Sequence, residues 1–343
     1  MGSGLACGAR NDSRGSHAIP LDRETMMKRR TVLIGGAAAL AAASARAQAV
    51  TRVVFPFGAG GGGDTLCRIL TEDVRASGGR QMIVENRTGA DGRIGINSVR
   101  TSAPDGTTFL VTTGPTMWLM PLVHPAPGYD PFRDFAPVSQ LALFEFCVAV
   151  ANSTGITSMA ELAAWAKANP GRASYAIPGA GTIPHFLGVS LSKLVGVDMR
   201  RVPYRGGAPA LNDLVGGQIP LSVGTLADAL AQHRAGTIRI IATTGERRSP
   251  FTPDLPTLKE SGFDLVGDAW YGMWAPRDTP ASVVADMNAA MVATLSKEAI
   301  RSRLTDIGLV ATGTSADRLV ELMRGQVAQW KPVIDESGYK MEN

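Results

Sequence analysis

RVVFPFGAGGGGDTLCRIL, which runs from Arg52 to Leu70, is the stretch of sequence from which the fold follows. Its apolar run up to Phe57 predicts a strand buried on both faces of a parallel sheet. A helix follows, since apolar residues recur at helical spacing after Asp64 or Thr65, either of which could cap it. The glycines from 60 to 63 leave backbone N–H groups open at the positive end of that helix. The stretch therefore predicts an anion-binding turn.

The same turn also fits a dinucleotide-binding protein. Residues 58–63 formally satisfy the pattern G-x-G-x-x-G, and Glu85 closes the next predicted strand at about the distance of a ribose-binding acid. An exported NAD(P)-dependent oxidoreductase is thus the alternative function, although a run of glycines matches many patterns by chance. A phosphate-binding P-loop is excluded, because no Gly-Lys-Ser/Thr follows and Asp64 would repel phosphates.

The N-terminus predicts export. Residues 1–25 form a polar upstream extension without periodicity, and residues 26–49 read as a signal peptide, with the biological start at Met26 or Met27. The cluster Lys28-Arg29-Arg30 precedes an apolar run, residues 32–43, which is too short for a transmembrane anchor, and small residues supply a cleavage site. The destination is the periplasm, through the general secretory route or, given the paired arginines, the twin-arginine route.

Charge and cysteine content exclude several classes of function. Residues 1–49 hold 7 of the 34 Lys and Arg and 3 of the 30 Asp and Glu, so 27 of each sign remain. A formally neutral mature chain gives no support for nucleic-acid binding. Cys67 and Cys147 do not form a metal-binding pattern, and two buried thiols are favoured over a disulfide between them.

Strands and helices alternate after Glu85, which predicts an α/β protein with ligands at the carboxyl ends of parallel strands. Thr113 lies at one such end, either as a helix cap or as a ligand contact. The apolar run from Leu141 to Val150 predicts a long strand, and the polar break at residues 152–155, followed by an amphipathic helix from Ser158 to Ala168, marks a crossover into a second α/β unit. Helices at residues 281–295, 297–304 and 315–331 are expected to finish the chain. We expect residues 50–150 with 273–343 to form lobe 1, and residues 151–272 to form lobe 2.

Metal sites and an α/β-hydrolase nucleophile have no sequence support. The histidines are scattered, and no His-x-x-x-His, Gly-x-Ser-x-Gly or Cys-x-x-Cys occurs. A second glycine turn, residues 178–182, precedes a helix that carries His185, either a ligand contact or a structural histidine. The lack of a catalytic constellation predicts a protein that is not an enzyme and that holds no cofactor or metal.

Short blocks along the chain also occur together, and in order, in one family. They are Val54-Phe-Pro-Phe57 with Gly60-Gly61 and Asp64; Val84-Glu-Asn-Arg87 with Gly89-Ala90 and Gly92; Ala103-Pro-Asp-Gly106; Tyr129-Asp-Pro131; Ala168-Asn-Pro-Gly171; Val202-Pro-Tyr204; Ala208-Pro-Ala-Leu211 with Gly216-Gly-Gln218; and Trp270-Tyr-Gly272. In these blocks the chain resembles the Bug-type, or TctC-type, solute receptors of tripartite tricarboxylate transporters. The resemblance implies a type II periplasmic binding protein fold, two lobes joined by two crossing strands and closing over a small carboxylate.

The resemblance also implies which residues contact the ligand, mainly through backbone amides. They are Phe57, Gly58, Ala59, Gly60, Gly61, Asp64 and Thr113 in lobe 1, and Gly181, Thr182, His185, Gly206, Gly207 and Ala208 in lobe 2. The implied partners are a membrane permease or a sensor protein, and we expect a monomer.

Two departures from the family pattern bear on the ligand. Gly58-Ala59 replaces two prolines, which should loosen the first turn, and Gly224-Thr225 replaces an Asp-Asn pair. The second change removes the natural partner for an ammonium group near Thr225. We therefore expect a carboxylate with a neutral or apolar remainder, or with a second carboxylate near Arg205, in preference to an amino acid.

Overall fold

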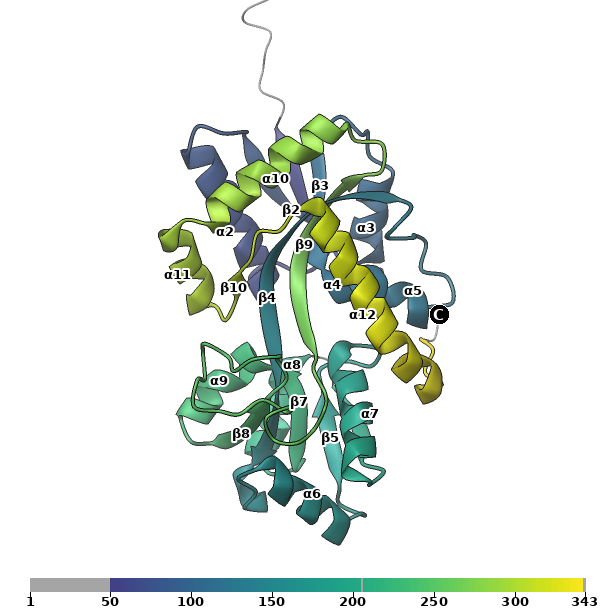
Figure 1. Cartoon of the computed structure of the whole chain (residues 1–343), viewed down its shortest axis with the longest axis vertical. Helices are drawn as coiled ribbons and strands as arrows, with labels where there is room; N and C mark the ends of the chain where they lie inside the picture. The colour runs from purple at the N-terminus through teal and green to yellow at the C-terminus, as the bar shows by residue number, and fades with distance from the viewer. Residues whose placement is uncertain (1–49, 205, 342–343) are drawn as a thin grey trace, which may run out of the picture. The chain divides into compact units, whose positions relative to one another are not determined.

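The computed structural model describes residues 50–204 and 206–341. The expected upstream extension and signal peptide, and the predicted contact Arg205, lie outside the described residues. Within them, two α/β lobes are joined by two long strands (Figure 1). None of the helices described is long and apolar enough to cross a membrane.

The sheet of lobe 1 has the strand order β2-β1-β3-β9-β4, and β10 pairs with β4. Its strands are β1 (Thr51–Phe55), β2 (Met82–Asn86), β3 (Thr108–Thr113), β4 (Phe135–Ala151), β9 (Asp268–Pro276) and β10 (Val310–Ala311). β1 pairs in parallel with β2 and β3, as the buried apolar run predicts. β9 pairs antiparallel with both β3 and β4, so the sheet is mixed.

The sheet of lobe 2 has the order β4-β7-β5-β6, and β8 also pairs with β4. Its own strands are β5 (Ser174–Ile177), β6 (Arg200–Pro203), β7 (Leu221–Thr225) and β8 (Ile238–Thr243). β4 pairs with β9 up to Glu145 and with β7 from Phe146 onward. The change of partner falls between these residues, somewhat before the expected boundary at 150, and β9 begins at Asp268. We propose to divide the lobes at these two points.

Helices cover both faces of the two sheets. They are α2 (Gly62–Ala76), α3 (Arg93–Arg100), α4 (Gly114–Trp118), α5 (Met120–Val123), α6 (Met159–Ala168), α7 (Ile183–Val195), α8 (Gly207–Val215), α9 (Leu226–Arg234), α10 (Ala281–Leu295), α11 (Glu298–Asp306) and α12 (Ala316–Ser337), with short 3-10 turns η1 (Ala90–Gly92) and η2 (Asn152–Thr154). Local chemistry sets several ends: Ser158 and Ser315 accept hydrogen bonds from the first turns of α6 and α12, and Gly196 ends α7 at φ 74°.

The core beneath the crossing strands is rich in tryptophan. Trp118, Trp270, Trp274 and Trp330 are each at most 1% exposed. Gln326 on α12 accepts hydrogen bonds from the indoles of Trp118 (2.8 Å) and Trp270 (3.0 Å) and donates one to Asp268 (3.1 Å). These hydrogen bonds hold α12 against the first residues of β9, where the chain passes from lobe 2 back to lobe 1.

The C-terminal segment does not belong to lobe 1 alone, although we expected residues 273–343 there. α12 runs alongside β9 toward α7 (Figure 1), where Glu336 forms an ion pair with Lys193. Beyond it, the ring of Tyr339 packs edge-on against His185 in lobe 2, with 4.8 Å between ring centroids. The backbone N–H of Met341 donates to the carbonyl of Val123 in lobe 1 (2.8 Å). Residues 338–341 therefore contact both lobes.

Cys67 and Cys147 are both buried and unpaired, as favoured from the sequence. Cys67, on α2, belongs to a core cluster of lobe 1, and Cys147, on β4, belongs to a core cluster of lobe 2. Burial raises the pKa of both thiols, so both stay protonated at neutral pH. They are core residues of the two lobes.

Candidate functional site

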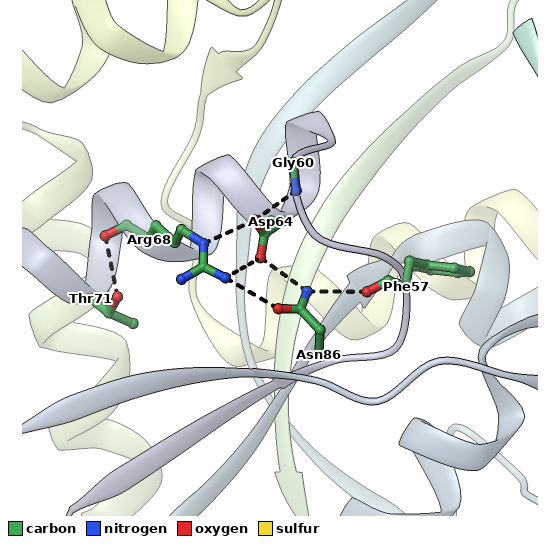
Figure 2. Close-up of polar contacts among 6 residues, drawn as sticks. All are labelled: Phe57, Gly60, Asp64, Arg68, Thr71 and Asn86. Atoms are coloured by element: carbon green, nitrogen blue, oxygen red, sulfur yellow. Dashed lines mark hydrogen bonds and ion pairs between the residues drawn. The ribbon is translucent and has the colours of Figure 1, made fainter.

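The first glycine turn lies between β1 and α2, and Asp64 holds its shape (Figure 2). Asp64 is the third residue of α2 and not its cap, since the helix begins at Gly62 after Gly61. Its carboxylate reaches back to accept a hydrogen bond from the N–H of Gly60 (2.9 Å), which has φ 88°. A left-handed backbone of this kind favours glycine. The sequence therefore specifies both the donor of this hydrogen bond, Gly60, and its acceptor, Asp64.

A polar network fixes Asp64 in turn (Figure 2). Arg68 donates two hydrogen bonds to its carboxylate (2.9 and 3.0 Å), and Asn86 donates one (3.0 Å) and another to the carbonyl of Phe57 (3.1 Å). Burial acts to raise the pKa of Asp64, but the hydrogen bonds from Arg68, Gly60 and Asn86 outweigh it and lower the pKa. Asp64 is thus a buried, ionised support of the turn, and its carboxylate is already occupied by protein donors.

The second glycine turn, before α7, repeats this construction with a different side chain. Gly181 has φ 71°, and its N–H donates to Nδ1 of His185, four residues further on (3.0 Å). The His185 ring is fully buried, stacks on Phe186 and contacts the Arg201 guanidinium through Nε2. Burial, with help from the Arg201 charge, lowers the pKa of His185 to about 4, so the ring is neutral at pH 7. The structure gives His185 a supporting role in place of the ligand contact we expected.

A cavity of about 320 Å³ lies between the two lobes. Its walls come from lobe 1 (Phe57, Asp91, Thr113, Pro115, Thr116, Leu119, Met120), the crossing strands (Phe144, Phe146, Ala269), lobe 2 (Pro178, Ala180, Gly181, Thr182, Ile183, Pro184) and the C-terminal segment (Met341). Its volume is at the lower end of the roughly 300–1,000 Å³ usual for small-molecule sites. A larger groove of about 500 Å³ runs along the outer side of α7 and includes none of the predicted contacts.

The predicted contacts divide into groups by their position. Phe57, Thr113, Gly181 and Thr182 line the cavity between the lobes. Gly58, Ala59, Gly60 and Gly61 form the exposed first turn and do not line it. Gly207 and Thr225 line a small cavity of about 10 Å³ in lobe 2. Gly206 and Ala208 line neither cavity, Asp64 and His185 are buried behind the turns, and Arg205 lies outside the described residues.

Thr113 caps a helix, which is one of the two roles that the sequence left open, and it also lines the cavity. Its hydroxyl accepts a hydrogen bond from the N–H of Thr116 (3.2 Å) and lies 2.7 Å from the Thr116 hydroxyl, so it caps α4. Both threonines also line the cavity. They provide hydroxyl groups at the carboxyl end of β3, where ligands of α/β proteins bind.

Sequence reasoning missed several residues of the site. Phe144 and Phe146 stand in the predicted crossover strand, and only their place next to the lobe boundary hinted at the cavity. Nothing in the sequence indicated Met341. Asp228 on α9 was also missed: the residue as a whole is open to solvent, but its carboxyl lies next to Gly207 at the small cavity, where desolvation raises its pKa. It puts an acid near Gly224 and Thr225, where the resemblance had led us to expect none.

Comparisons with known proteins identify the family of this chain. A family model described as "Tripartite tricarboxylate transporter family receptor" matches residues 66–339. The "UPF0065 protein in tcbD-tcbE intergenic region" of Pseudomonas sp. (strain P51) is 31% identical over 320 residues, which cover 90% of this chain and 94% of that protein.

Solved structures resemble the chain over nearly their whole length. The periplasmic binding protein BugD is 30% identical with a TM-score of 0.72, and covers 85% of this chain and 99% of its own. MatC from Rhodopseudomonas palustris with bound malate is 29% identical with a TM-score of 0.70 (83% and 98%). R. palustris Rpa4515 with adipate is 30% identical with a TM-score of 0.74 (84% and 97%).

The predicted periplasmic binding protein fold and the predicted receptor class are thereby confirmed. The family consists of periplasmic solute-binding receptors and is not a class of enzymes. In the described residues no group of His, Cys, Asp or Glu side chains is placed to hold a metal ion. The chain belongs to the receptor family of the tripartite tricarboxylate transporters.

Proposed function

We propose that this receptor captures a small carboxylate in the cavity between its lobes and presents it to a membrane permease or a sensor protein. The observation that carries the proposal is the pair of glycine turns, one on each lobe. Each has a left-handed glycine whose N–H is tied to a buried side chain four residues later, Asp64 or His185. Because these turns are already ordered before a ligand binds, their amide donors can bind a carboxylate at little cost in conformational entropy.

The direct contacts in this proposal are Phe57, Thr113, Gly181 and Thr182, since they line the cavity. The exposed first turn, residues 58–61, would reach the ligand as the lobes close. Structures related to this chain hold malate and adipate, which supports a carboxylate as the ligand class. The leader at residues 26–49 would bring a monomeric receptor to the periplasm.

Ligand binding can be tested by thermal denaturation and calorimetry with a panel of mono- and dicarboxylates, next to aspartate and glutamate. A ligand at 100 times its dissociation constant stabilises the protein by about 2.7 kcal/mol, enough to raise the melting temperature by several degrees. Mass spectrometry of small molecules that co-purify with the protein gives an independent identification. Tight binding of NAD or NADP, or no response to any carboxylate, would contradict the proposal.

Two glycine variants distinguish a loss of ligand affinity at the first turn from the loss of stability that backbone strain causes at any such glycine. Gly60 and Gly196 have similar φ values, 88° and 74°, and a Cβ atom at either position meets no other atom within 4 Å. Gly60→Ala and Gly196→Ala should therefore lose similar amounts of stability. We expect only Gly60→Ala, in the first turn, to weaken carboxylate binding. Equal effects of the two variants on affinity would show that the turn does not contact the ligand.

A further inference from the structure

Aromatic rings form a continuous series from lobe 1 to the crossing strands. Phe57 packs on Phe55 with 5.5 Å between ring centroids, Phe55 on Tyr271 at 6.4 Å, and Tyr271 on Phe144 at 5.1 Å. Phe144 packs in turn on Phe146 at 5.7 Å, edge to face. Each ring is thus braced by a neighbour, and the series forms a rigid unit.

Three rings of this series face the cavity between the lobes. Phe57, Phe144 and Phe146 line it, and Phe57 and Phe144 keep part of their surface exposed. Most of the remaining wall is apolar, including Leu119 and Ile183. An apolar wall of this extent is suited to the body of a ligand that carries few polar groups.

The polar side chains that line the cavity are few and come from both lobes. Threonine hydroxyls come from Thr113 and Thr116 on one side and from Thr182 on the other. Among the described residues that line the cavity, the one charged side chain is Asp91, an acid. None of these lining residues is cationic, so a second carboxylate on the ligand would find no side chain of opposite charge among them and would meet a largely apolar wall.

We propose that the preferred ligand is an aromatic monocarboxylate, with its carboxylate at the glycine turns and its ring against Phe144 and Phe57. This inference rests on the proposed function and narrows its ligand class. Aromatic pairs in edge-to-face or offset arrangements gain affinity beyond the apolar area that they bury. For one ring the gain corresponds to about a 2- to 10-fold tighter dissociation constant.

Benzoate and cyclohexanecarboxylate provide a matched test, because both place a six-membered carbon ring on one carboxylate. Calorimetry on the full-length mature protein should give a dissociation constant about 2- to 10-fold lower for benzoate. Malate and adipate serve as dicarboxylate comparisons and should bind more weakly than benzoate.

Leucine variants test whether the phenylalanine rings of the cavity cause the preference for benzoate over cyclohexanecarboxylate. Phe144→Leu keeps an apolar side chain but removes the ring, and should abolish the preference for benzoate over cyclohexanecarboxylate. Phe57→Leu tests the same point if Phe144→Leu proves unstable. Phe132→Leu is the control, since Phe132 is 43% exposed and outside the cavity, and should keep the preference.

The outcomes distinguish this inference from the function on which it rests. If malate or adipate binds more tightly than benzoate, or if benzoate and cyclohexanecarboxylate bind equally, the aromatic ligand is refuted and the carboxylate receptor stands. If the preference survives Phe144→Leu and Phe57→Leu, the aromatic wall is not its source and the inference fails. If no carboxylate binds, the proposed function fails as well.

Discussion

Acidification should loosen the second glycine turn through His185. The N–H of Gly181 donates to Nδ1 of the neutral ring, and Nε2 lies beside the Arg201 guanidinium. A second proton would remove the acceptor for Gly181 and place a buried positive charge next to another. The folded protein therefore resists protonation of this ring, whereas the unfolded chain does not.

The size of this effect follows from the two pKa values. The pKa of His185 is lowered from 6.5 to about 4, so between these values the unfolded chain binds more protons and stability falls as the pH falls. Near pH 7 the contribution of the neutral ring is almost fully present. From pH 7 to pH 5, linkage predicts a loss of about 2 kcal/mol in the free energy of unfolding from this residue alone.

Urea denaturation at pH 7, 6 and 5 measures this loss, with His185→Asn as the matched variant. The Oδ1 atom of asparagine should accept from the N–H of Gly181 as Nδ1 does, but it does not titrate. Other groups change with pH in both proteins, among them His233, whose pKa burial also lowers. The difference between the two proteins isolates His185. If the stabilities of wild type and His185→Asn fall in parallel from pH 7 to pH 5, the reasoning is wrong.

Other substitutions test the supports of the site. Asp64→Ala should cost about 1–3 kcal/mol by removing the carboxylate that accepts hydrogen bonds from Gly60, Arg68 and Asn86, and Asp64→Asn should cost less and retain more ligand affinity; equal losses on denaturation and calorimetry would contradict this. Gln326→Leu should lower the free energy of unfolding by more than about 2 kcal/mol, since two buried indole N–H groups lose their acceptor. Glu145→Gln should raise stability at pH 7, because burial raises the pKa of Glu145 and its ionised form is disfavoured; a decrease in the denaturation midpoint would refute it. Gly188→Ala should destabilise by about 1–3 kcal/mol, as its Cβ would collide with the Tyr175 ring, and an unchanged melting temperature would be inconsistent with that packing.

Periodicity predicted much of the fold. The helix expected at residues 281–295 is α10 (Ala281–Leu295), and the helix expected at residues 158–168 is α6 (Met159–Ala168), with Ser158 as its cap. These elements have strong local signals that agree with their tertiary surroundings. The buried strand and glycine turn at the start of the chain were predictable for the same reason.

Prolines account for two errors in the predicted elements. β4 begins at Phe135, earlier than the apolar run suggested, because Pro137 lies at a register shift where its missing N–H does no harm. α12 continues through Pro332 to Ser337, although the sequence suggested a stop before the proline. In both cases tertiary packing overrides the local signal.

The candidate site was only partly predictable from the sequence. The sequence indicated the two turns, but it could not show that His185 points back to Gly181, because a histidine at the start of a helix has the same pattern in either role. Phe144 was assigned to an apolar strand without a face toward the ligand. Met341 reaches the cavity only through the path of the C-terminal segment, which no local pattern records.

The position of β9 has a consequence for how the chain folds. β9 lies between β3 and β4, although β4 precedes it by more than a hundred residues of lobe 2. The chain from Phe146 to Gly267 contains every strand of the lobe 2 sheet. The sheet of lobe 1, in contrast, lacks the strand between β3 and β4 until β9, residues Asp268–Pro276, has been made. During synthesis lobe 2 can therefore assemble first, and lobe 1 must wait for the last quarter of the chain. Such long-range pairing slows folding. A delay of this kind leaves the edges of β3 and β4 that β9 later covers without a pairing strand until most of the chain has been made.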